Sequence, residues 1–342
     1  MDLLRVLSLF LCLIPSVVLS SQTLSPAPQR DDSQAFLSSA RRVNGLDSDN
    51  VQPWHIRGTF KFFNKDGKVD DSGVYEEWWW GAAKYKRSYT SSKLTQVEYA
   101  TSKGLFRDGS QDWLGADTML LRSSLIQPLL KEDELKEFKF ERHNEPAGKS
   151  NLDCVTLYFP VTGKVSKDFF PVFCFDPAMP VLRVTSSIGN TRTIYESIVQ
   201  FQGHYLAREI HTYTSGKPRS DLSLDVIEGL KEPAESILIL PSTALPVDLT
   251  NVSLKSDFAV KLKTMPADFP NEARIHGIQG TVAVQFTVGK DGHVTDAQAV
   301  SGPPVLQPAA VNAVRQWFYK PLLVMGQPIE FKAKVDMDFY NH

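Results

Sequence analysis

The sequence lacks the features that mark several classes of protein. Its 342 residues carry 37 Lys and Arg against 39 Asp and Glu, so the formal net charge is −2. This balance argues against a dedicated nucleic-acid binder, which needs a concentrated basic surface. No apolar run reaches the roughly 18 residues that a membrane-spanning helix requires. With 42% hydrophobic residues the chain can still bury a core, and its length predicts two domains or one large domain.

Motifs that support catalysis or bind cofactors are also missing. The sequence has no Walker loop, no Gly-x-Gly-x-x-Gly turn, no Gly-x-Ser-x-Gly elbow and no His-Glu-x-x-His pair. His204 and His211 lie seven residues apart on one expected strand, so they face opposite sides and cannot share a metal ion. Glu209 does share a face with His211, which we interpret as a surface pair. We therefore expect no catalytic residue, no cofactor and no metal site.

The first twenty residues differ from the rest of the chain. Arg5 precedes an apolar run from Val6 to Leu19, and the compact residues Val18 and Ser20 occupy the −3 and −1 positions of a signal-peptidase site. This pattern predicts a secretory signal peptide over residues 1–20 and an exported protein. An uncleaved signal that anchors the chain to the membrane is the alternative.

Three cysteines are present, and Cys12 lies within the expected signal peptide. Cys154 and Cys174 lie in two strand-like segments, each ten residues from Lys164. An antiparallel hairpin centred on Lys164 would place these two cysteines opposite each other, close enough to form a disulfide in an oxidising compartment. Two free buried thiols are the alternative.

The remaining chain divides by composition into four segments. Residues 21–50 are polar and predict a flexible or helical lead-in. Residues 51–230 are aromatic and rich in strand patterns with frequent turn signals, which predicts an antiparallel β-meander with one or two helices. Residues 231–256 contain three prolines and predict a linker, and residues 257–342 form a last small unit.

The layout of residues 51–230 resembles, loosely, the half-barrels that carry lipoproteins or lipids through the periplasm. A hydrophobic ligand in this region is therefore one interpretation. Trp78 and Trp80 would share one face of a strand while Trp79 takes the other. These side chains would form either a packed sheet face or an aromatic wall toward a ligand.

Residues 257–342 carry a clear succession of helix and strand patterns. Pro270 opens a short helix that ends at Gly277, and two alternating strands flank the tight turn Gly289–Gly292. A second helix starts near Pro308, and residues 329–340 alternate between apolar and polar. This order predicts α-β-β-α-β, with two helices on one face of an antiparallel sheet, so the fold class of the whole chain is α+β.

The same residues resemble the C-terminal domain of the TonB family. The resemblance covers about 80 residues and keeps the order and spacing of the motif, whose positions here are Phe269, Pro270, Ala273, Gly277, Gly280, Asp291, Gly292, Trp317 and Pro321. It implies a non-catalytic, exported interaction module in the periplasm that contacts TonB-dependent outer-membrane transporters and supports transport across the outer membrane. A periplasmic carrier of a hydrophobic ligand, with the TonB-like unit as a docking tag, is the alternative function.

The resemblance does not extend to the N-terminus. TonB energy transducers keep an uncleaved N-terminal helix with a Ser-x-x-x-His pattern that engages an inner-membrane proton channel. Residues 1–20 contain no histidine, and no long Pro-rich spacer follows them. Coupling to such a channel therefore has no support in this sequence.

The last strand of the small unit is the expected docking site. It enters the sheet last and should lie at an edge, where unpaired backbone groups can bind an extended peptide. The residues expected to pair with a transporter peptide are Ile329, Glu330, Phe331, Lys332, Ala333, Lys334, Val335 and Asp336. An ordinary protected edge is the alternative.

Overall fold

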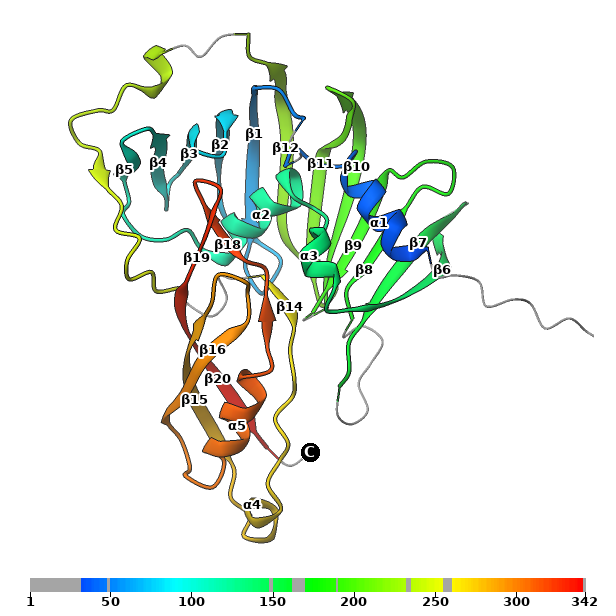
Figure 1. The fold of residues 1–342 in the computed structure, drawn as a ribbon, viewed down its shortest axis with the longest axis vertical. Coiled ribbons are helices and arrows are strands. Elements are labelled where there is room, and N and C mark those ends of the chain that lie inside the picture. Colours follow the sequence, from blue (N-terminus) through cyan, green and yellow to red (C-terminus); the bar gives the residue numbers. More distant parts are fainter. Residues whose placement is uncertain are drawn as a thin grey trace, which may run out of the picture. The chain divides into compact units, whose positions relative to one another are not determined.

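Thirteen strands form one antiparallel sheet that runs through residues 54–246 (Figure 1). The structure is a computed structural model that describes residues 32–47, 50–147, 150–161, 170–188, 190–231, 235–254 and 260–340. The expected signal peptide lies outside the described residues. Within the described part of the chain, no helix is both long and apolar enough to cross a membrane.

Two meanders build this sheet. The first consists of β1 (Trp54–Phe63), β2 (Val69–Gly81), β3 (Lys84–Ser91), β4 (Thr95–Thr101) and β5 (Gly104–Gly109). The second consists of β6 (Lys139–Ala147), β7 (Ser150–Tyr158), β8 (Val172–Phe175), β9 (Leu182–Ser187), β10 (Thr191–Phe201), β11 (His204–Thr214) and β12 (Lys217–Gly229). Antiparallel pairing of β1 with β12 joins them into one sheet. The prediction of a mostly antiparallel sheet with few helices is confirmed.

Three helices pack on the core face of the sheet: α1 (Ser33–Arg41), α2 (Ala116–Ile126) and α3 (Glu132–Leu135). Leu37 and Ala40 of α1 are buried in the same hydrophobic cluster as Leu121 and Leu125 of α2. Within the lead-in expected over residues 21–50 to be flexible or helical, residues 33–41 form a helix. Their apolar positions are three and four residues apart, which suits a helix that buries one face.

The cysteine pair lies on neighbouring strands. Cys154 on β7 is opposite Cys174 on β8, and a disulfide joins their sulfur atoms, which are 2.08 Å apart. Both side chains are buried. The predicted hairpin centre, Lys164, lies outside the described residues.

The segment expected to be a linker contains short regular elements and two buried side chains, although many of its described residues are exposed. It contains the 3₁₀ helix η2 (Glu235–Leu238) and the short strand β13 (Leu245–Pro246), which pairs with β5 at one end of the large sheet. Val252 and Leu254 are buried in the core of the C-terminal unit. Residues 32–342 group together as one compact unit, and the domain boundaries drawn from composition remain a prediction.

The C-terminal unit is built around a three-stranded sheet in the order β16-β15-β20. Its elements are β14 (Lys261–Lys263), α4 (Asn271–Ile275), β15 (Gly280–Val288), β16 (Val294–Ser301), α5 (Gln307–Val314), β17 (Phe318–Tyr319), β18 (Leu322–Val324), β19 (Gln327–Ile329) and β20 (Phe331–Phe339). The short strands between α5 and β20 were not expected from the sequence. Because β19 includes Ile329, the strand expected over residues 329–340 begins only at Phe331.

Charged side chains tie α2 to the core face of the large sheet. Arg122 on α2 donates two hydrogen bonds of 2.8 Å to the carboxylate of Glu77 on β2, which is fully buried. Glu98 on β4 accepts hydrogen bonds from Arg87 and Arg107 on the strands beside it. Burial alone would raise the pKa of Glu77 and Glu98, but the neighbouring guanidinium groups outweigh it and hold both pKa values below the usual range.

We expect Glu77→Gln to lower the free energy of unfolding by about 3–5 kcal/mol, because it leaves the Arg122 charge without its carboxylate. Since the pKa of Glu77 is lowered in the folded state, its contribution is complete above the unfolded value of about 4.3. It is lost as the pH falls toward the folded pKa. Urea unfolding of parent and variant at pH 7 and in acid measures both effects.

Asp225→Asn is the matched control, because the Arg57–Asp225 ion pair is half exposed on the other face. It should change the free energy of unfolding by less than about 1 kcal/mol. Equal losses in the two variants would contradict the structural role given to Glu77.

Candidate functional site

The outer edge of β20 is the candidate site. β20 pairs with β15 along an unbroken register from Gly280 opposite Phe339 to Val288 opposite Phe331. In an antiparallel strand, the backbone N–H and C=O of alternate residues point to opposite sides. Every second residue of β20 therefore directs its backbone groups away from β15.

Hydrogen bonds at Lys332 show which residues these are. The N–H of Lys332 donates to the carbonyl of Val252, and its carbonyl accepts from the N–H of Leu254, both at 2.8 Å. Lys332 therefore faces outward, and so do Lys334, Asp336 and Asp338, whereas the odd-numbered residues bond to β15. Among the described residues, 252–254 occupy the edge at Lys332, and no other residue pairs with the outward side of 334–338.

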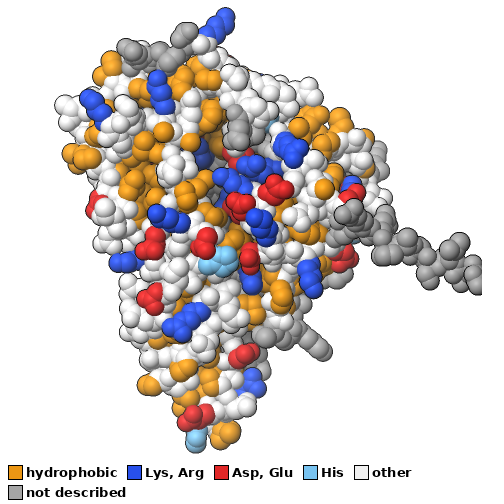
Figure 2. Space-filling view, viewed as in Figure 1, with side chains coloured by type: hydrophobic (Ala, Val, Ile, Leu, Met, Phe, Trp, Pro, Cys, Tyr) orange, Lys and Arg blue, Asp and Glu red, His pale blue; other side chains and the backbone are white. Residues whose placement is uncertain are grey.

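The burial of the side chains of β20 alternates between odd-numbered and even-numbered residues in the same way. Phe331, Ala333 and Phe339 are buried under the helices, while Val335 and Met337 are only half buried. The even-numbered side chains are exposed and carry charges of both signs. Figure 2 shows charged side chains of both signs scattered over this unit, at the bottom of the view, rather than a patch of one sign. A partner at this edge would therefore meet outward-pointing backbone groups, with half-buried apolar side chains on one face of the strand and charged side chains on the other.

Two residues of the expected partner strand lie elsewhere. Ile329 belongs to β19 and pairs with Leu322 on β18, and Glu330 lies between β19 and β20. Met325 and Gly326, both with positive φ, form the turn of this hairpin. The side chain of Val324 is buried against β3–β5 of the large sheet, so tertiary packing holds the hairpin away from the edge. The expectation that Ile329 and Glu330 continue the edge strand is therefore wrong.

The N-terminal motif residues shape the region around α4. The ring of Phe269 packs edge-on against Phe339, with centroids 5.8 Å apart, and the helix starts directly after Pro270. Ala273 is fully buried. Gly277 and Gly280 both have positive φ, which suits glycine at the connection from α4 into β15. Packing or backbone geometry explains each of these residues, so their role is to stabilise the fold.

The C-terminal motif residues hold the β15–β16 hairpin against β17. Asp291 accepts a hydrogen bond from the N–H of His293 in the turn, and the carbonyl of Gly292 accepts one from the N–H of Tyr319. The indole N–H of Trp317 donates to the carbonyl of Met265. Pro321 leads from β17 into β18.

Lys320, which precedes Pro321, connects this unit to the large sheet. Its Nζ donates a 2.9 Å hydrogen bond to the carbonyl of Gln127, just after α2. Burial lowers the pKa of Lys320, while the negative charges of Glu134 and Asp47 act in the opposite direction. Lys320 thus connects the C-terminal unit to the helical layer of the large sheet.

The tryptophans of β2 pack against neighbouring rings. Trp79 stacks on Trp54 at 5.7 Å on the core side, and Trp78 stacks on His55 at 4.6 Å on the other face. The cavity beside α2, lined by residues such as Leu125 and Leu206, has a volume of about 10 Å³. That volume holds a water molecule and not a lipid.

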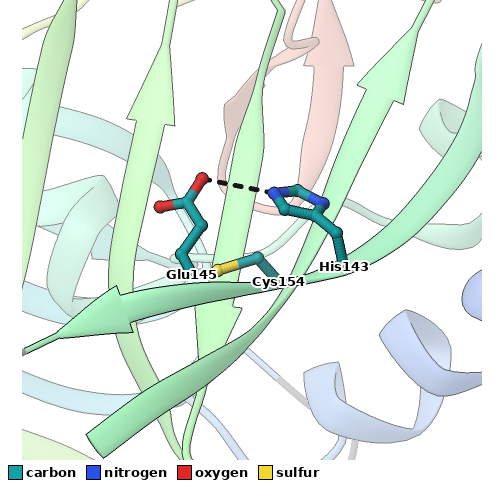
Figure 3. A group of neighbouring side chains, drawn as sticks. All are labelled: His143, Glu145 and Cys154. Atoms are coloured by element: carbon teal, nitrogen blue, oxygen red, sulfur yellow. Dashed lines mark hydrogen bonds and ion pairs between the residues drawn. The ribbon is translucent and has the colours of Figure 1, made fainter.

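One group of potential metal ligands lies on β6 and β7 (Figure 3). His143 Nε2 is 3.2 Å from a carboxylate oxygen of Glu145, and the sulfur of Cys154 lies beside them. The Cys154 sulfur is bonded to Cys174, so no thiolate remains to bind a metal ion. We therefore do not assign a metal site here.

Comparison with known proteins shows what the C-terminal unit is similar to. Residues 265–340 match the family model of the Gram-negative bacterial TonB protein C-terminal. Protein TonB of Helicobacter pylori is 32% identical over 96 residues, which is 25% of this chain and 34% of that protein. The chain thus spans about a third of the length of this curated relative. The predicted resemblance to the C-terminal domain of TonB is confirmed for this region.

Solved structures are similar to two parts of the chain. The C-terminal domain of Pseudomonas aeruginosa TonB is 26% identical and covers 26% of this chain and 93% of that domain, with a TM-score of 0.23. A LolA superfamily protein from Nitrosomonas europaea is 11% identical and covers 60% of this chain and 97% of that protein, with a TM-score of 0.39.

The turn at Gly292 gives a direct test of the motif's structural role. We expect Gly292→Ala to destabilise the protein by at least about 2 kcal/mol, because its φ is +92° and a Cβ would lie 2.1 Å from the carbonyl oxygen of Tyr319. Gly277→Ala is the matched control, since Gly277 has a φ of +62° but open space around it. It should cost about 1 kcal/mol. Chemical unfolding measures both, and a milder effect at Gly292 would contradict this assignment.

Proposed function

We propose that this chain is an exported protein of the bacterial envelope whose C-terminal unit docks a peptide of a TonB-dependent outer-membrane transporter. The peptide adds a strand to the outer edge of β20, over residues 334–338. The observation that carries the proposal is the outward direction of the Lys334, Asp336 and Asp338 backbone groups, which follows from the bonds of Lys332.

The similarity of residues 265–340 to the TonB C-terminal family supports the same partner class, because this resemblance implies contact with TonB-dependent outer-membrane transporters. Strand addition also fits the surface chemistry. Backbone hydrogen bonds supply affinity without a deep pocket, and the half-buried Val335 and Met337 favour apolar side chains at alternate peptide positions. The partner is therefore an extended peptide with alternating apolar residues.

The proposed location is the periplasm, which rests on the signal peptide expected over residues 1–20 and the disulfide between Cys154 and Cys174. The proposed role is a supporting one in transport across the outer membrane. Energy transfer from an inner-membrane proton channel is not part of the proposal.

A carrier of a hydrophobic ligand is the alternative function. It would need space on the core face of the large sheet, where Trp54, Tyr75 and Phe60 are fully buried and the cavity beside α2 is the size of a water molecule. Lipid that co-purifies with the chain in a fixed ratio would favour this alternative over peptide docking.

Lys334→Pro tests the docking edge. Proline removes the outward N–H of Lys334 and leaves the hydrogen bonds to β15, which belong to the odd-numbered residues. We expect labelled N-terminal peptides of transporters to bind at least about tenfold more weakly in fluorescence anisotropy. Lys334→Ala keeps the N–H and should bind like the parent.

Circular dichroism must show that the proline variant is folded, and Asp336→Pro, which removes the next outward N–H, is a second variant. Parent-like binding by both folded proline variants would overturn docking at this edge. Equal weakening by Lys334→Ala would show that the side chain, and not the backbone, binds the peptide.

A further inference from the structure

A histidine and three carboxylates meet on the face of the large sheet that points away from the helices. Glu196 lies on β10, Glu209 and His211 lie on β11, and Asp221 lies on β12. The neighbouring residues Tyr195, Ile210 and Leu222 are buried on the core side, so alternation places these four side chains on the opposite face. All four remain partly exposed, and an ion can reach them from solvent.

The register of the strands brings the group together. Glu196 is directly opposite Glu209, and His211 is directly opposite Asp221. One oxygen of each glutamate and one ring nitrogen of His211 lie within 4.8 Å of one another. The Nε2 atom of His211 is 3.8 Å from a carboxylate oxygen of Glu196.

Two glutamates directly opposite each other on antiparallel strands repel. Among the described residues, no ion pair joins Glu196 or Glu209 to a lysine or arginine. Lys61 lies opposite Asp221 on β1, which is three strands from β10 and thus roughly 14 Å away. A bound cation would remove this repulsion.

Asp221 sets the orientation of the imidazole. Its carboxylate oxygen is 2.7 Å from Nδ1 of His211, and an ionised carboxylate can only accept a hydrogen bond. Nδ1 therefore carries the proton, and in the neutral ring the lone pair lies on Nε2, on the side of Glu196. A carboxylate that fixes a histidine in this way is the usual outer-shell partner of a metal ligand.

We propose that Glu196, Glu209 and His211 bind one divalent zinc ion on this face, with Asp221 as the positioning residue. An imidazole nitrogen with two carboxylates suits zinc, whose bonds of about 2.0–2.2 Å place neighbouring ligands about 3.4 Å apart. The exposed glutamate side chains need only small rotations to contract to that spacing. Three protein ligands leave a position on the ion for water.

His55 provides a matched contrast within the same sheet. Both of its ring nitrogens are held by carboxylates, Nε2 by Glu76 at 2.9 Å and Nδ1 by Glu228 at 2.7 Å, and its ring stacks on Trp78. No lone pair of this imidazole is open to an ion. A variant at His55 therefore removes a histidine beside two carboxylates without touching the proposed site.

Zinc binding by the tag-free full chain, measured in competition with a fluorescent zinc chelator, tests the proposal. The parent should bind one zinc ion with micromolar or tighter affinity. His211→Gln and Glu209→Gln should each weaken binding at least about 100-fold, and Asp221→Asn should weaken it about 10–100-fold. His55→Gln should bind like the parent.

Zinc should also raise the midpoint of thermal unfolding of the parent and of His55→Gln, and leave those of the His211 and Glu209 variants unchanged. Circular dichroism of the metal-free variants verifies the fold. The proposal is overturned if the parent binds no zinc at micromolar concentration. It is also overturned if His211→Gln retains parental affinity, which would mean adventitious binding elsewhere.

Discussion

Antiparallel backbone pairing is the constraint on which the whole structure depends. Along the large sheet, each strand forms backbone hydrogen bonds with the strand beside it. The pairing of β1 with β12, which are distant in the sequence, joins the two meanders. In the small sheet, no described strand pairs with the outer side of β20 beyond Lys332. Because unpaired edges bind further strands, the rule that builds the fold also creates the proposed docking site.

Local sequence patterns predicted those features that depend on near neighbours along the chain. The strict alternation of residues 331–339 and the Asp291-Gly292 turn both reappear in the structure, because strand faces and tight turns are decided within a few residues. The opposition of Cys154 and Cys174 also followed from counting along one hairpin. In each case the residues that form the sequence pattern are also the ones that determine the local structure.

Features that depend on distant contacts were missed. The parallel bridge between Ser253 and Lys332 joins a segment with weak periodicity to the edge strand, and it forms because Val252 and Leu254 bury their side chains nearby. Likewise, Glu196 reaches His211 only through the register of two neighbouring strands. The turn residue Gly326 was the one local signal that could have revealed the β18–β19 hairpin.

The central claim is that the outward backbone groups of β20 bind the partner peptide, and amide hydrogen exchange tests it most directly. In the free protein, the amides of Lys334, Asp336 and Asp338 should exchange quickly, while those of Val335 and Met337 should be protected by β15. A saturating transporter peptide should slow exchange at the three even-numbered residues. Fast exchange there, under conditions in which the peptide is shown to be bound, would contradict the account.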